Sequence, residues 1–167
     1  MALASLLLSG FACWFWLMPQ LMAEIRPGSQ AIGVTSELAE VADADLAGAL
    51  STTGLPAATA ALLKQSSRNC MQRLAWVTLV RGGGQSDESI RLRSGNYFSP
   101  VIRLPATPVR VAIPFPGPYA SGEGNLTVLG ADAGLTVALT PPWSILPNSS
   151  SATHHVTWRP SESCKQP

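Results

Sequence analysis

The chain has 167 residues and a net charge of +1 at pH 7, and charged side chains make up only 13% of it. This length suits one modest domain plus a short additional segment. A net charge so close to zero argues against a protein that binds nucleic acid over a broad basic surface. The 14 glycines and 14 prolines favour a loop-rich β domain over a helical bundle.

The N-terminal residues 2–23 contain no charged side chain. About 20 apolar residues suffice to cross a bilayer, and aromatic side chains such as Trp14, Phe15 and Trp16 suit its interface. A cleaved signal peptide is the alternative, but it would carry a basic start and a shorter apolar run. We therefore predict a retained membrane anchor over residues 1–23, with the lipid bilayer as its partner.

Two observations bear on the side of the membrane that the domain occupies. Arg26 directly follows the apolar run, and the positive-inside rule would then place the domain in the cytoplasm. Cys70 and Cys164 flank nearly all of the β-rich region, and such a pair suggests a disulfide in an exported domain, although two unrelated thiols are the alternative. Following the cysteines, we predict a single-pass protein of a bacterial inner membrane with its domain in the periplasm.

A hydrophobic N-terminal helix joined to a β domain resembles type IV pilins and pseudopilins, and Gly10-Phe11 is similar to their processing point. Their pattern requires a glutamate at the fifth mature residue, where this chain has Phe15. Pro27-Gly28 would also interrupt their long helix. A pseudopilin-like assembly component is therefore kept only as an alternative.

Residues 24–35 contain Pro27, Gly28 and Gly33 and are typical of a linker. Residues 36–69 are predicted to form a helical spacer, because apolar residues from Leu38 to Leu50 fall near helical spacing. A first helix is expected from Ser36, and a second from Pro56, a residue type favoured in a first helical turn.

From residue 70 to the C-terminus the apolar period changes to two, which is typical of strands that are buried on one face. The expected strands are 74–81, 89–93, 109–113, 126–128, 135–140 and 156–158. Turn residues separate them at fairly regular intervals. We predict a mainly β fold, a small antiparallel β-sandwich of Ig-like or jelly-roll-like type.

Arginines form the first candidate site. If strands 89–93 and 109–113 are neighbours, their guanidinium groups share one sheet face and can bind carboxylate or phosphate groups. An acidic protein, an anionic polysaccharide or lipid head groups would then be the partner, whereas an ordinary solvated face is the alternative. These residues are Arg91, Arg93, Arg103 and Arg110.

Aromatic residues in Gly/Pro-rich segments form the second candidate site. Flat rings in loops suit sugars or protein partners, but such rings also cover the ends of a small core. The residues are Tyr97, Phe98, Phe115, Tyr119 and Trp143. They support a carbohydrate- or cell-wall-binding module as an alternative function.

Catalytic signatures are missing from the sequence: it has no nucleophile elbow, zinc-protease motif, phosphate loop or dinucleotide fingerprint. His154 and His155 are adjacent in an expected strand, so their rings should point to opposite faces and cannot easily share a metal ion. We therefore predict no enzyme, cofactor, metal site or nucleic-acid partner. The expected role is that of a membrane-anchored accessory or structural subunit of an envelope complex, which docks other protein subunits.

Overall fold

The computed structural model describes residues 34–68, 72–82, 88–161 and 164. The chain from Thr35 onwards forms one compact unit. The predicted anchor with Trp14, Phe15 and Trp16, and the features behind the pilin resemblance, lie outside the described residues. Within the described residues, no helix has the length and apolar character that crossing a membrane requires.

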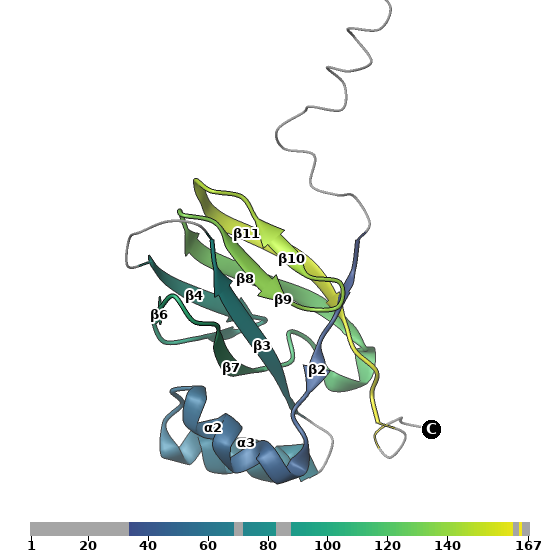
Figure 1. The fold of residues 1–167 in the computed structure, drawn as a ribbon. Coiled ribbons are helices and arrows are strands. Elements are labelled where there is room, and N and C mark those ends of the chain that lie inside the picture. Colours follow the sequence, from purple (N-terminus) through teal and green to yellow (C-terminus); the bar gives the residue numbers. More distant parts are fainter. Residues whose placement is uncertain (1–33, 69–71, 83–87, 162–163, 165–167) are drawn as a thin grey trace, which may run out of the picture. The chain divides into compact units, whose positions relative to one another are not determined.

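Two β-sheets make up most of the unit, which confirms the predicted mainly β fold (Figure 1). The six-stranded sheet has the order β1 (Ser36–Glu37), β11 (Ser149–Thr157), β8 (Glu123–Ala131), β4 (Glu88–Ser94) and β5 (Tyr97–Phe98), and β6 (Ile102–Leu104) also pairs with β4. The five-stranded sheet has the order β10 (Trp143–Ile145), β9 (Leu135–Ala138), β3 (Leu74–Arg81) and β2 (Ala39–Glu40), and β7 (Val109–Pro114) also pairs with β3. All strand pairs are antiparallel except β1 with β11.

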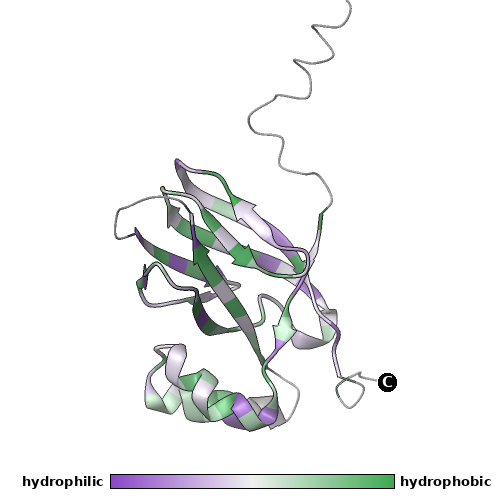
Figure 2. Cartoon of the chain, in the orientation of Figure 1, coloured by the Kyte–Doolittle hydropathy of each residue, from purple (hydrophilic) through white to green (hydrophobic). Residues whose placement is uncertain are grey.

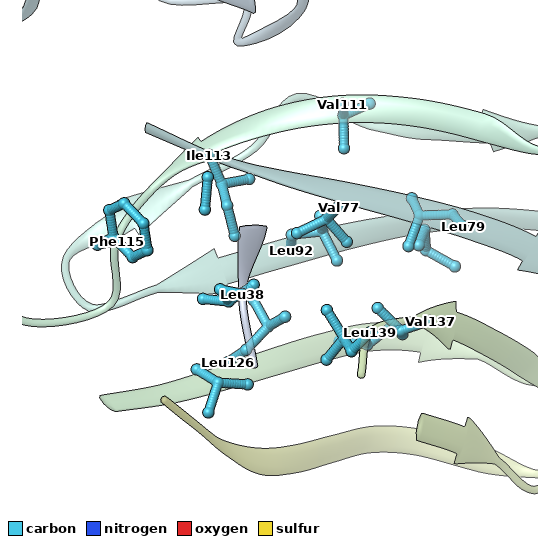
Figure 3. Close-up of a cluster of buried hydrophobic side chains, with 14 of the residues drawn as sticks. Leu38, Val77, Leu79, Leu92, Val111, Ile113, Phe115, Leu126, Val137 and Leu139 are labelled. Atoms are coloured by element: carbon cyan, nitrogen blue, oxygen red, sulfur yellow. The ribbon is translucent and has the colours of Figure 1, made fainter. Parts of the chain in front are cut away.

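The main core lies between the inner faces of the two sheets. Alternate side chains of β3, β4, β8 and β9 meet there, as Figure 3 shows for Val77, Leu92, Leu126 and Val137, each 0% exposed. Each such burial stabilises the fold by roughly 1.5–3 kcal/mol relative to an exposed side chain. The hydrophobic and hydrophilic bands along the strands in Figure 2 reflect the same alternation.

The longer strands agree with the sequence-based prediction. Residues 74–81 form β3 with the predicted bounds, and the other predicted segments fall in β4, β7, β8, β9 and the end of β11, except that residues 139–140 and 158 lie beyond the ends of β9 and β11. The short strands β5, β6 and β10 were not predicted, because two or three residues are too few to show an alternating pattern.

The prediction of a helix beginning at Ser36 is wrong. The segment instead crosses from one sheet to the other, since Ser36 lies opposite Val156 in β11 and Ala39 lies opposite Trp76 in β3. Ser36 and Leu38 are buried whereas Glu37 and Ala39 are exposed, which is strand alternation. Apolar residues at 38 and 41 suit either element, and pairing with strands far along the chain decides between them.

The helical elements begin later than predicted. A short 3-10 helix, η1 (Asp43–Asp45), leads into α2 (Leu46–Thr52), and Gly54 at φ +64° separates α2 from α3 (Ala57–Arg68). The second helix therefore follows Pro56 as predicted. Ala49 of α2 packs on Leu74 and Ala112 of the five-stranded sheet and forms a second, smaller core.

Candidate functional site

The four candidate arginines do not share one face, because β4 pairs with β8 while β7 pairs with β3 in the other sheet. Arg110 therefore lies apart, with its guanidinium 4.1 Å from the ring centroid of Trp76. Arg91 and Arg93 alternate with the buried residues of β4. Arg103, in β6, lies opposite Ser89 of β4. These three exposed arginines share the outer face of the six-stranded sheet.

Where β8 and β11 cross the same outer face, its side chains are polar, and Glu123 adds one carboxylate at the start of β8. Thr127 lies opposite both Arg93 and Thr153, and the two threonine hydroxyl oxygens are 2.9 Å apart. Asn125 is the next outward residue of β8 and lies opposite His155. Helix α2 packs on the five-stranded sheet (Figure 1). It therefore does not cover the outward side chains of β8 and β11.

A shallow groove of about 430 Å³ opens on this face beside Arg93. Hydroxyl and amide side chains line it together with the turns at the end of the sheet. The lining residues are Arg93, Gly95, Pro116, Gly124, Asn125, Thr127 and Thr153. The glycines keep side chains out of this end of the groove, and a Cβ atom at Gly124 would come within 2.9 Å of Pro116.

The Arg93 guanidinium is held by two contacts. Its Nε donates a hydrogen bond to the carbonyl oxygen of Gly95 at 3.3 Å, and its Cζ lies 5.5 Å from the ring centroid of Phe98. Within the part of the chain that the structure describes, its two terminal nitrogens make no hydrogen bond. They are therefore available to a ligand.

His155 and Glu123 lie on the same outer face, next to Asn125. The His155 Nε2 atom is 3.4 Å from Glu123 Oε2, and its Nδ1 atom is 3.3 Å from Asn125 Oδ1. Both side chains are largely exposed, so this pair contributes little to stability. Glu123 therefore places one acidic group on this face, beside the His155 imidazole.

Two of the five candidate aromatic residues are buried, which for these two favours the alternative that such rings cover the end of the core. Phe115 and Tyr119 are 5% and 2% exposed, and the Phe115 ring packs against the rings of both Tyr119 and Trp158. Tyr97 is half-buried and donates a hydrogen bond from its hydroxyl to the carbonyl oxygen of Thr53 at 2.6 Å. Burial raises the pKa of the Tyr97 hydroxyl above its ordinary value.

The other two aromatic candidates are separate from this cluster. Phe98 is 52% exposed and lies beneath Arg93. Trp143 is half-buried and stacks on His154 with ring centroids 4.9 Å apart. Together the five rings form no common platform, because the Gly/Pro-rich loops fold back over the ends of the sandwich.

A network around Glu40 was not predicted from the sequence. Arg73 donates to Oε1 of Glu40, and the Tyr119 hydroxyl donates to Oε2 at 2.5 Å. The same hydroxyl accepts a hydrogen bond from the backbone N–H of Ser161 at 3.0 Å. Burial, followed by the bond to Glu40, raises the pKa of Tyr119, so the phenol stays protonated and continues to donate.

A second cleft of about 340 Å³ adjoins this network. It is lined by Glu37, Leu38, Ala39, Glu40, Thr140, Trp158 and Arg159. Glu37 pairs with Arg159 at 3.4 Å, and Glu40 is engaged by Arg73 and Tyr119. No set of three or more His, Cys, Asp or Glu side chains suited to a metal ion occurs among the described residues. This network joins Glu40 of β2 to Arg73 just before β3, to Tyr119 in the η2 corner (Tyr119–Ser121) and to Ser161 after β11. Its role is structural.

Cys164 is 5% exposed, belongs to the main core and is disulfide-bonded. Cys70 lies outside the described residues, so the pairing of Cys70 with Cys164 stays a prediction.

The two adjacent histidines point to opposite faces, as predicted. His154 faces inward, where its Nε2 atom is 2.8 Å from Ser36 Oγ, whereas His155 faces outward. Burial, followed by repulsion from His155, lowers the pKa of His154 below its ordinary value of 6.5. The unfolded chain therefore binds a proton at this residue more readily than the folded one does.

This difference predicts an acid-dependent loss of stability. The free energy of unfolding should fall as pH drops below about 6.5 and level off once the folded-state pKa has been passed. His154→Gln should reduce that slope strongly, whereas His155→Gln should reduce it only in part, because it removes the repulsion and leaves the burial of His154. Urea denaturation at a series of pH values measures the slope, and an equal slope in wild type and His154→Gln would refute the assignment.

No family model, curated protein or solved structure matches this chain. The site must therefore be interpreted from its own geometry. On the outer face of the six-stranded sheet, the sequence pointed to the three arginines at positions 91, 93 and 103. It did not point to Asn125, Thr127 and Thr153. The available signal was that Asn125 and Thr127 are two residues apart in one alternating strand, and that Thr153 lies in another.

Proposed function

We propose that this protein is a membrane-anchored accessory subunit of a bacterial envelope complex, and that it docks an acidic protein partner through the outer face of the six-stranded sheet. The carrying observation is that this face presents Arg91, Arg93 and Arg103 beside a groove, against a single carboxylate, that of Glu123. Arginine is favoured at interfaces because its planar fork can bind a carboxylate with two hydrogen bonds.

The strand order supports an Ig-like module for this role. β4, β8 and β11 form one sheet, β3 and β7 belong to the other, and β1 lies alongside the last strand. β4, β8 and β11 correspond to strands C, F and G of an Ig-like sandwich, and β3 and β7 correspond to strands B and E. The hairpin of β9 and β10 is an addition. Such sandwiches offer a rigid sheet face as a binding surface.

The membrane part of the proposal is supported by the uncharged run over residues 2–23. A retained helix would hold the domain beside its membrane partners, with the domain in the periplasm, where a disulfide persists. N-terminal sequencing of the membrane-bound protein tests this part, since a mature chain that begins at Glu24 contradicts a retained anchor.

Charge reversal tests the docking face. The full chain, tagged at its C-terminus, is expected to recover one or more partner subunits in a fixed ratio from gently solubilised membranes. The triple variant Arg91→Glu, Arg93→Glu, Arg103→Glu should weaken that recovery by at least about thirtyfold, because each reversal replaces attraction with repulsion.

Arg110→Glu supplies the matched control for this experiment. It makes one of the same Arg-to-Glu reversals, at an exposed arginine of the other sheet, so recovery of the partner should stay close to wild type. Equal losses in the control and the triple variant would show a general charge effect and contradict a docking face.

A further inference from the structure

The Arg93 guanidinium borders the groove on the outer face of the six-stranded sheet. It is already oriented by the hydrogen bond from Nε to Gly95 and by the Phe98 ring, which leaves both terminal nitrogens available. A carboxylate bound by two parallel N–H groups is the strongest arrangement that arginine makes with an anion. Because the side chain is held in advance, little rotamer freedom remains to be lost on binding.

The remainder of the groove suits an extended polypeptide. Asn125, Thr127 and Thr153 supply neutral donors and acceptors that can pair with a peptide backbone. A volume of about 430 Å³ lies within the range of roughly 300–1,000 Å³ that is typical of ligand sites. Arg91 and Arg103 lie farther along the same face and extend its positive charge.

The charges and rings on this face favour a peptide over two other anionic partners. Binding to an anionic membrane surface commonly uses clusters of about 4–8 basic residues, whereas this face has three arginines and the carboxylate of Glu123. A polysaccharide site would use exposed aromatic faces, but Phe98 already lies against Arg93 and the other candidate rings are buried or half-buried.

We propose that this groove binds an extended acidic segment of the partner protein, with one Asp or Glu carboxylate held by the Arg93 guanidinium and the backbone of the segment lying over Thr127 and Thr153. The proposal rests on the proposed docking function and names the part of the partner that the face recognises. Arg91 and Arg103 would then attract neighbouring acidic side chains at longer range.

The test uses the full chain in mild detergent and a short polyglutamate peptide as the probe. Binding measured by calorimetry should weaken roughly ten- to hundredfold in Arg93→Gln. Arg93→Lys should lose nearly as much, because lysine keeps the charge but lacks the planar fork. Arg110→Gln, the matched control, should bind within about twofold of wild type, as expected for a distant surface position.

Four outcomes of this binding test would overturn the proposal: no binding of polyglutamate, wild-type binding by Arg93→Lys, equal losses in Arg93→Gln and Arg110→Gln, or tighter binding to an acidic polysaccharide than to polyglutamate. Unfolding curves of the Arg93 variants should match wild type, because Arg93 is exposed. A partner lost from the triple variant but retained at wild-type level by Arg93→Gln would refute the groove and leave the docking face intact. Failure to recover any partner from membranes would instead contradict the proposed function.

Discussion

Tyr119→Ala is expected to lower the free energy of unfolding by about 3–5 kcal/mol, the usual range for truncating a buried aromatic side chain. The ring lies 5.2 Å from Phe115 between centroids and is 2% exposed, so its removal leaves a cavity in the main core. Removal also deprives Glu40 of a hydrogen-bond donor. Denaturant unfolding of the full chain, followed by tryptophan fluorescence, measures the change.

Tyr119→Phe separates the packing of this residue from its hydrogen bonds. The variant keeps the ring but removes the hydroxyl that joins Glu40 to the backbone of Ser161. A loss of about 1–3 kcal/mol is expected, since a partly buried carboxylate loses a donor. A Tyr119→Ala protein as stable as wild type would contradict the core position of this residue.

Loss of the disulfide at Cys164 should have a comparable effect. If Cys70 is its partner, the bridge closes a loop that contains nearly the whole sandwich, and the chain-entropy model then assigns it about 4–5 kcal/mol. Cys70→Ser and Cys164→Ser should each lower the free energy of unfolding by that amount. Peptide mapping without reductant identifies the pairing directly.

Cys13→Ser is the control for the two disulfide variants. It makes the same chemical change in the N-terminal apolar run, so stability should remain at the wild-type value if Cys70 pairs with Cys164. A large loss in Cys13→Ser together with no loss in Cys70→Ser would show that the predicted pairing is wrong.

The long strands could be predicted because their period of two is local information. In β4, for example, Ile90 and Leu92 alternate with Arg91 and Arg93, and the structure buries the first pair and exposes the second. The crossing segment from Ser36 to Glu40 could not be predicted in this way. Its conformation depends on partners far along the chain in β11 and β3, which local spacing does not reveal.

The candidate site was partly predictable for the same reason. Alternation placed Arg91 and Arg93 on one face. Which strand lies beside β4 depends on tertiary contacts, so the expectation that Arg110 shares this face was wrong. For Phe115 and Tyr119 the sequence left two interpretations open, a binding loop or a cover for the end of a small core, and the structure buries both rings. Composition alone does not distinguish a covering loop from a binding loop.

Recovery of a partner by the tagged full chain from solubilised membranes, compared between wild type and the triple arginine reversal, tests the central claim most directly. We predict an acidic partner in fixed ratio with wild type and with Arg110→Glu, and little or none with the triple variant. A folded triple variant that recovers the same partner in the same amount would contradict docking through this face.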